Sequence, residues 1–218
     1  MKKKVFIQFL AVALIAVVFT VLVKTVDLGF VSNTDSAIGF ASINLSFNSK
    51  FGFNPLLYKV SEYLGYSVFV IVAFFALLGI RELVKNKSLL KVDSDLYALA
   101  ITYIFTLVVY FVFDKLLVIN LRPLIMSGEM VAEPSFPSSH TLLAVVVCGT
   151  AIAECGKVKK SGLRIILTLI LSLLMAATVL TRLFSGVHWV TDIVGGVLWG
   201  EALMMVFQLI STLLRKEK

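Results

Sequence analysis

Apolar stretches of membrane-spanning length dominate this chain and restrict what it can fold into. An α-helix needs about 20 residues to cross a hydrocarbon core of about 30 Å. Hydrophobic residues make up 59% of the sequence, whereas soluble domains contain roughly 45–50%. We therefore predict an all-α integral membrane protein, a six-helix bundle that forms a single domain over residues 1–218. The predicted helices span residues 5–23, 66–83, 96–119, 139–155, 163–180 and 191–214.

The distribution of positive charge predicts the orientation of these helices. The termini and loops on one side carry 14 lysine and arginine residues, whereas the loops on the other side carry six. Because short cytoplasmic loops are enriched in positive charge, we expect a multi-pass protein of the cell membrane with both termini in the cytoplasm. The net charge of +7 comes mostly from these flanking residues, so it does not indicate a nucleic-acid partner.

The segment from residue 27 to residue 64 is expected on the extracytoplasmic side. It mixes aromatic and aliphatic residues with Ser, Asn and Gly. Asn54 followed by Pro55 is typical of a helix start, with the asparagine as the cap and the proline at the first helical position. We expect one or two short interfacial helices here. They either simply connect two membrane helices or form a lipid-contacting rim around a site.

Polar residues gather near the predicted helix ends on this same side, and charged groups at membrane depth usually mark function. The chain has two histidines. His188 and Asp192 are four residues apart, so they share a face if this segment is helical. A carboxylate beside an imidazole fixes its tautomer, and such an imidazole can attack phosphorus. The alternative for Asp192 is a first-turn carboxylate that stabilises the helix dipole.

The second histidine and three cations complete this group of polar residues. His140 follows two serines at the predicted start of a helix, where free N–H groups bind anions and a histidine can act as a general acid. Arg122, Arg182 and Lys115 offer positive charge to a phosphate, the arginines as bidentate donors and the lysine as a point charge. The alternative for Lys115 is that its side chain only reaches toward the lipid headgroups.

The order and spacing of these residues resemble the signature of the phosphatidic acid phosphatase type 2 (PAP2) superfamily. The matching motifs are Lys115 with Arg122-Pro123, then Pro137-Ser138-Ser139-His140, then Thr181-Arg182 with His188 and Asp192. The motifs cover residues 115–192, and the helix pattern covers nearly the whole chain. The resemblance implies a six-helix membrane enzyme with its active site at the extracytoplasmic face.

The resemblance also implies a role for each matched residue. His188 is the expected nucleophile, Asp192 orients it, and His140 is the expected general acid. The expected phosphate ligands are three cations and two serines: Lys115, Arg122, Arg182, Ser138 and Ser139. Fixed positive groups in such a site are usually the largest catalytic contribution. We expect no metal ion and no cofactor.

Two positions depart from the family pattern. Ser139 stands where the family has glycine, and its side chain adds bulk close to the expected phosphate. Thr181 stands where the family has serine and keeps the hydroxyl group. Neither change removes a charged participant, so we expect an active enzyme.

These inferences predict a metal-independent lipid phosphatase or diphosphatase that works through a phosphohistidine intermediate. Its substrate would be a lipid phosphate at the outer leaflet, such as undecaprenyl diphosphate, phosphatidylglycerol phosphate or phosphatidic acid. Membrane lipids are the other expected partners. A phosphotransferase with the same site is the first alternative, and a catalytically inactive lipid-binding or transport protein is the second.

Overall fold

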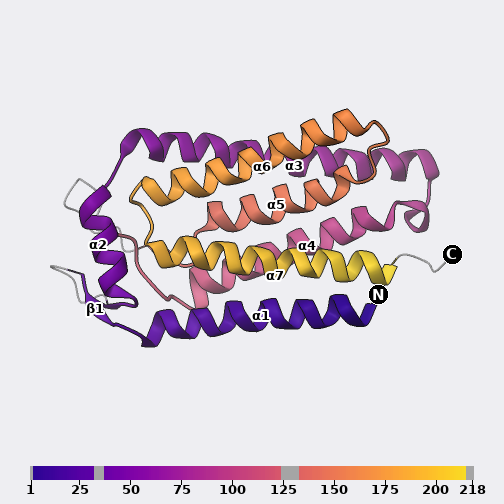
Figure 1. Ribbon diagram of the computed structural model, residues 1–218. Coiled ribbons are helices and arrows are strands. Elements are labelled where there is room, and N and C mark those ends of the chain that lie inside the picture. The colour runs from indigo at the N-terminus through magenta and orange to yellow at the C-terminus, as the bar shows by residue number, and fades with distance from the viewer. Residues whose placement is uncertain (1, 32–36, 124–132, 215–218) are drawn as a thin grey trace.

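The chain is almost entirely helical in the computed structural model, which describes residues 2–31, 37–123 and 133–214. Long helices lie side by side, and one short helix crosses an end of the bundle (Figure 1). The helices are α1 (Lys2–Thr25), α2 (Ala41–Phe51), α3 (Pro55–Asn86), α4 (Ser94–Phe111), α5 (Ser139–Cys155), α6 (Ser161–Phe184) and α7 (Val190–Leu214). The smaller elements are strands β1 (Gly29–Phe30) and β2 (Ala37–Ile38), which pair antiparallel, a 3-10 turn η1 (Leu89–Lys91) and a π-helical turn η2 (Val112–Leu116) that continues α4.

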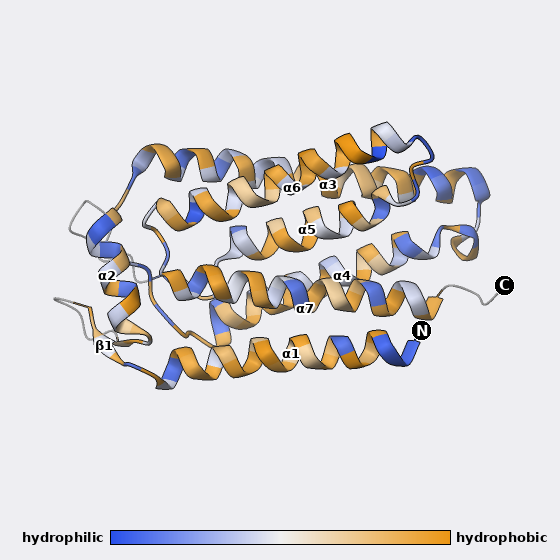
Figure 2. Ribbon diagram, in the orientation of Figure 1, coloured by the Kyte–Doolittle hydropathy of each residue, from blue (hydrophilic) through white to orange (hydrophobic). Residues whose placement is uncertain are grey.

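The bundle has the distribution of polarity that a bilayer requires. Within the described residues, five helices are long and apolar enough to cross a membrane, namely α1, α3, α4 with η2, α6 and α7. Leu, Ile, Val and Phe side chains are widely exposed on these helices, and polar residues concentrate toward the two ends of the bundle (Figure 2). Such extensive apolar surface marks contact with a membrane. The predicted multi-pass helical membrane protein is therefore confirmed.

Helix α5 lies at the centre of the bundle. It has 17 residues, fewer than the other long helices, and it packs against α3, α4, α6 and α7. Leu142 and Val146 of α5 form a buried cluster with Leu203 of α7. Figure 1 shows that α5 starts deeper in the bundle than α3, α6 and α7 reach at the same end. Its first turn is therefore surrounded by the ends of longer helices.

The main correction to the predicted helices concerns α3. The sequence predicted a helix over residues 66–83, preceded by one or two short interfacial helices. Among the residues of this region that the structure describes, there is one short helix, α2, followed by a continuous α3 of 32 residues. The predicted helix start is confirmed, because the Asn54 side chain accepts hydrogen bonds from the backbone N–H groups of Leu56 and Leu57. At 1.5 Å per residue, α3 is about 48 Å long, well over the thickness of a bilayer core.

Polar residues that face the bundle explain why hydropathy missed the first turns of α3. Ser61 is fully buried, and Glu62 forms an ion pair with Arg182 of α6. These side chains lower the local hydropathy, yet both are helix-compatible residues whose partners lie on a neighbouring helix. The extra turns of α3 therefore bring polar side chains into one end of the bundle.

The loop between α6 and α7 approaches the segment before α3 too closely to admit a side chain. Gly186 has a φ angle of 74°, which glycine adopts without a steric penalty. A Cβ atom at this position would lie 2.0 Å from the carbonyl oxygen of Gly52. Beside it, the backbone N–H of Asn54 donates to the carbonyl oxygen of Ser185 at 3.0 Å. These contacts fix the chain that leads into α7.

Replacing Gly186 with alanine should destabilise the protein. A non-glycine residue in this conformation costs about 1–3 kcal/mol, and the clash with Gly52 adds to that cost. In a thermal unfolding experiment in detergent, we expect the midpoint to fall by at least about 2–4 °C. Gly79→Ala is the matched control, because nothing lies within 4 Å of a Cβ atom built there. Equal midpoints for the two variants would contradict this interpretation of the loop.

Candidate active site

Most of the residues selected from the sequence lie at one end of the bundle. The ends of α1, α4 and α6 meet the beginnings of α3, α5 and α7 there, and α2 lies across them (Figure 1). His188 lies in the loop before α7, His140 in the first turn of α5, and Arg182 in the last turn of α6. Residues that are distant in the sequence are thus gathered where three helices begin.

A buried imidazole–carboxylate pair forms the centre of this group. The Nδ1 atom of His188 lies 3.6 Å from Oδ2 of Asp192. The Asp192 carboxylate has no solvent exposure and is fixed from both sides. Its Oδ2 accepts from the backbone N–H of Trp189 at 2.9 Å, and its Oδ1 accepts from Nδ2 of Asn120 at 2.9 Å. The carboxylate in the first turn of α7 can therefore orient the imidazole.

A network of amides and a hydroxyl supports this carboxylate. Asn44 of α2 donates from Nδ2 to the hydroxyl of Thr191 at 2.9 Å, and its Oδ1 accepts from the backbone N–H of Thr191 at 3.2 Å. The Nε1 atom of Trp189 donates to the carbonyl oxygen of Leu121 at 2.7 Å. Together these bonds tie α2 and the segment after η2 to the start of α7.

Arg182 is enclosed between α3 and α6. Its side chain is 1% exposed, and its Nη1 atom donates to Oγ of Ser61 at 3.0 Å and to Oε1 of Glu62 at 2.7 Å. Its guanidinium carbon lies 5.5 Å from the centre of the Tyr58 ring. The preceding residue, Thr181, donates its hydroxyl to the carbonyl oxygen of Ala177 in its own helix. The Thr181 hydroxyl is therefore hydrogen-bonded within α6.

His140 is held against the same part of α3. Its Nε2 atom lies 3.5 Å from Oε1 of Glu62, so one carboxylate contacts both His140 and Arg182. A Cβ atom at Gly65 would lie 2.5 Å from Cδ2 of His140, which shows that the imidazole packs directly on the α3 backbone. The absence of a side chain at Gly65 makes room for the ring.

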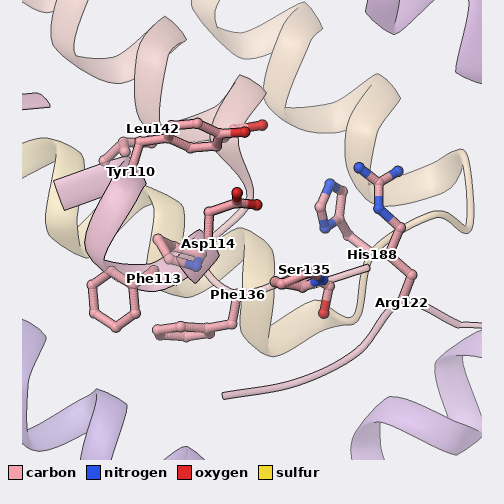
Figure 3. Close-up of a pocket in the computed structure, with 11 residues that line it drawn as sticks. Tyr110, Phe113, Asp114, Arg122, Ser135, Phe136, Leu142 and His188 are labelled. Atoms are coloured by element: carbon pink, nitrogen blue, oxygen red, sulfur yellow. The ribbon is translucent and has the colours of Figure 1, made fainter. Parts of the chain in front are cut away.

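A small cavity of about 40 Å³ lies beside the imidazole of His188. Figure 3 shows His188 next to the guanidinium of Arg122, with Asp114 on the other side of the cavity. Ser139 at the start of α5 also lines it. Arg122 pairs through Nε with Oε2 of Glu133 at 3.2 Å. The cavity thus places a cation, a serine and the predicted nucleophile around one space.

Ser138 takes a different position from Ser139. Its backbone N–H donates to the carbonyl oxygen of Asp192 at 3.0 Å, so this N–H is not free to bind an anion. The Ser138 hydroxyl and both ring nitrogens of His188 are buried and have no hydrogen-bond partner among the described residues. Buried polar atoms without partners are rare in proteins. Nδ1 of His188 faces the carboxylate of Asp192, so Nε2 is the ring nitrogen that is available to a ligand in the cavity that His188 lines.

Lys115 is the one selected residue whose side chain is largely exposed, and it does not line the cavity. Its side chain is 64% exposed and pairs with Asp114, whose Oδ2 lies 2.8 Å from Nζ. Both residues belong to the π-helical turn η2, and Asp114, not Lys115, lines the cavity. A π-helical turn inserts one extra residue per turn, which changes the direction of the side chains that follow.

A second, larger cleft of about 330 Å³ lies next to the small cavity. It is lined mainly by apolar residues of α3, α4 and α5, including Val68, Phe69 and Leu143. The cleft shares Tyr110, Ser139 and Leu142 with the small cavity, and Glu62 and His140 line its polar end. An apolar groove therefore leads to the charged group of residues.

Several residues of this site were not selected from the sequence: Asn44, Ser61, Glu62, Gly65, Asp114 and Asn120. Their positions follow from contacts between segments that are far apart in the chain. Within the described ranges, His, Cys, Asp and Glu side chains do not gather in threes as metal ligands. The positive charge at this site comes from arginine side chains.

Burial lowers the pKa of the His188 imidazole below its usual range. The guanidinium groups of Arg182 and Arg122 lower it further, while the carboxylate of Asp192 acts in the opposite direction. The protonated form is therefore populated only at acidic pH. At neutral pH the ring is uncharged and one nitrogen carries a lone pair.

Comparisons with known proteins agree with this arrangement. A family model described as the PAP2 superfamily matches residues 95–215. The crystal structure of a Bacillus subtilis protein, described as the first transmembrane PAP2-type phosphatidylglycerolphosphate phosphatase, superimposes with a TM-score of 0.68. The two chains share 15% sequence identity, and the match covers 96% of this chain and 98% of that chain. At this identity the likeness shows a shared fold. No curated protein matches the chain.

The protonation state of His188 can be measured directly because the chain has two histidines. Imidazole NMR in detergent should give a His188 titration midpoint below about 6.5, the value of an unperturbed histidine. Asp192→Asn removes the carboxylate that raises the pKa, so its midpoint should be lower still. A His140→Gln variant assigns the signals. A midpoint above that of free histidine, or a rise in Asp192→Asn, would contradict the geometry.

Proposed function

Because the chain belongs to the PAP2 superfamily, we propose that it is a lipid phosphatase or diphosphatase whose active site lies at the extracytoplasmic face of the membrane. The observation that carries the proposal is the buried His188–Asp192 pair at 3.6 Å, whose imidazole lines a cavity together with Arg122. Arg182 and His140 flank this pair from α6 and α5. A nitrogen nucleophile beside fixed cations suits the transfer of a phosphoryl group.

The first step of the proposed reaction transfers the phosphoryl group to His188. Nδ1 of His188 keeps its proton and directs it at the carboxylate of Asp192, so Nε2 carries the lone pair that attacks phosphorus. A bond forms between Nε2 and phosphorus while the bond between phosphorus and the leaving oxygen breaks. His140 donates a proton to that oxygen. The leaving group is a lipid alcohol for a monophosphate, or a lipid monophosphate for a diphosphate.

The second step hydrolyses the phosphohistidine. Water attacks phosphorus, and one of its protons passes to His140, which lost a proton in the first step. The bond between phosphorus and Nε2 breaks, inorganic phosphate leaves, and both histidines return to their starting states. Water is the only reactant needed besides the lipid phosphate, and the step involves no oxidation or reduction.

Cations stabilise the negative charge that the phosphoryl group carries during both steps. Arg122 and Arg182 are the proposed phosphate ligands that already lie at the site. Lys115 is the third, and it would exchange its ion pair with Asp114 for the phosphate. Ser138 and the backbone N–H of Ser139 would donate to phosphate oxygens. Removal of Lys115 should therefore cost less activity than removal of Arg182.

The adjoining apolar cleft supports a lipid as the substrate. Its volume of about 330 Å³ and its apolar walls suit part of a hydrocarbon chain. His140 and Glu62 at its polar end would place the phosphate next to the cations. The related Bacillus subtilis protein is described as acting on phosphatidylglycerolphosphate. We propose that lipid, undecaprenyl diphosphate and phosphatidic acid as candidate substrates.

The proposed topology has six membrane spans, with α5 as the sixth besides the five long apolar helices. The start of α1 and the end of α7 both lie at the end of the bundle opposite to the site (Figure 1). Lysine and arginine residues are concentrated at the end that holds the termini, which supports a cytoplasmic location for that end. The site would then face the outside of the cell membrane.

Phosphate release tests the proposed activity. The protein purified in detergent should release phosphate, in the presence of EDTA, from at least one of the three candidate lipids. His188→Ala should lower turnover by at least about 10³-fold, whereas Glu82→Gln at the other end of α3 should not. Activity that disappears in EDTA and returns with magnesium would contradict metal independence. Transfer of phosphate to an added alcohol in preference to water would identify a phosphotransferase.

The acid role of His140 can be separated from the nucleophilic role of His188. His140→Ala should turn over a lipid phosphate poorly, because an alkoxide leaving group needs a proton. Nitrophenyl phosphate has an acidic leaving group and should lose much less activity in the same variant. His188→Ala should be inactive on both substrates. Equal losses in His140→Ala on the two substrates would rule out the acid role.

A further inference from the structure

Helix α3 provides a seat for the imidazole of His140, the proposed general acid. The seat consists of Glu62 and Gly65, which are three residues apart and therefore lie on the same face of the helix. Oε1 of Glu62 lies 3.5 Å from Nε2 of His140. A Cβ atom at Gly65 would lie 2.5 Å from Cδ2 and 2.8 Å from Nε2 of the same ring. One residue thus brings a negative charge to the ring, and the other leaves the space that the ring occupies.

The contact with Glu62 distinguishes the two ring nitrogens of His140. Nε2 faces the carboxylate, which accepts hydrogen bonds and donates none when it is ionised, so Nε2 keeps its proton. Nδ1 is buried and has no hydrogen-bond partner among the described residues. It is therefore the nitrogen that is left to exchange a proton with a substrate. His188 has the opposite arrangement, because its Nδ1 faces Asp192.

Arg182 has donors for a phosphate while Glu62 stays beside His140. Glu62 and Ser61 both accept from Nη1 of Arg182, at 2.7 and 3.0 Å. A guanidinium has five N–H donors, and Nε of Arg182 is buried without a hydrogen-bond partner in the part of the chain that the structure describes. The carboxylate therefore need not leave the imidazole for the guanidinium to contact a phosphate.

We propose that Glu62 and Gly65 are positioning residues for His140, which hold its imidazole with Nε2–H toward the carboxylate and Nδ1 toward the leaving oxygen. The inference rests on the proposed function and deepens it. In the first step a proton moves from Nδ1 to the leaving oxygen, while Nε2 keeps its own proton and Glu62 stays ionised. In the second step Nδ1 takes a proton from the attacking water. The carboxylate attracts the imidazolium that is present before the first step and after the second.

The dependence of the rate on the leaving group tests this role. A proton from His140 matters most for an alkoxide leaving group, whereas Arg182 contacts the phosphate whichever group leaves. We compare kcat for dioctanoyl phosphatidic acid with kcat for nitrophenyl phosphate in detergent. Misplacing a catalytic group can cost about 100-fold, so Glu62→Gln should lower the ratio of these two rates by at least about tenfold. Glu82→Gln, the same change at the other end of α3, should leave the ratio unchanged.

Two further variants separate positioning from a general loss of stability. Gly65→Ala keeps every charge but places a methyl group against the ring, so it should lower the ratio as Glu62→Gln does. Gly79→Ala is its matched control, because nothing lies within 4 Å of a Cβ atom built there. In the His140→Ala background, Glu62→Gln should leave the ratio unchanged. An unchanged ratio in Glu62→Gln and Gly65→Ala, or a further fall in the double variant, would overturn the proposal.

Nitrogen NMR of the unmodified protein in detergent tests the geometry without turnover and without a variant of α3. The chain has two histidines, and His188→Ala assigns their signals. At alkaline pH the neutral ring of His140 should carry its proton on Nε2, the nitrogen that faces Glu62, and a proton on Nδ1 would overturn the proposal. Lack of turnover of every candidate lipid together with the expected tautomer counts against the proposed function and supports the placement of His140. Turnover with an unchanged ratio in the variants overturns the role of α3 alone.

Discussion

The site depends on the hydrogen bonds that hold the buried carboxylate of Asp192. A buried charge is tolerated only when it is hydrogen-bonded or paired, and the partners of Asp192 come from different parts of the chain. Asn120 follows η2, and Trp189 precedes α7. The backbone of the same residue accepts from Ser138 at the start of α5. The carboxylate of Asp192 therefore holds the imidazole of His188 and the segment that leads to Arg122, and its backbone carbonyl holds the start of α5.

The two acidic residues of the site have opposite physical properties. Asp192 is enclosed and held by two hydrogen bonds, so it can act as a permanent partner of His188. Glu62 is partly exposed at the edge of an apolar cleft, and its carboxylate contacts both Arg182 and His140. One carboxylate thus partners the buried imidazole, and the other partners the buried guanidinium.

Hydropathy was sufficient to predict the long helices, and motif spacing was sufficient to select His140, Arg122, Arg182, His188 and Asp192. The first turns of α3 were missed because Ser61 and Glu62 lower the hydropathy as loop residues do, although they face Arg182. Asn44 could not be selected because its partner Thr191 lies 147 residues away in the chain. Lys115 was selected by spacing alone, and the π-helical turn that contains it places Asp114 at the cavity instead.

Detection of a covalent phosphoenzyme tests the central claim, that His188 receives the phosphoryl group, most directly. The protein is incubated with a lipid substrate carrying a radiolabelled terminal phosphate and quenched in alkali, in which a phosphorus–nitrogen bond survives. The predicted result is a base-stable, acid-labile label on the unmodified protein and on Glu82→Gln, and no label on His188→Ala. A label of the same amount on His188→Ala, or turnover of the lipid without any labelled protein under conditions that trap the intermediate, would contradict it.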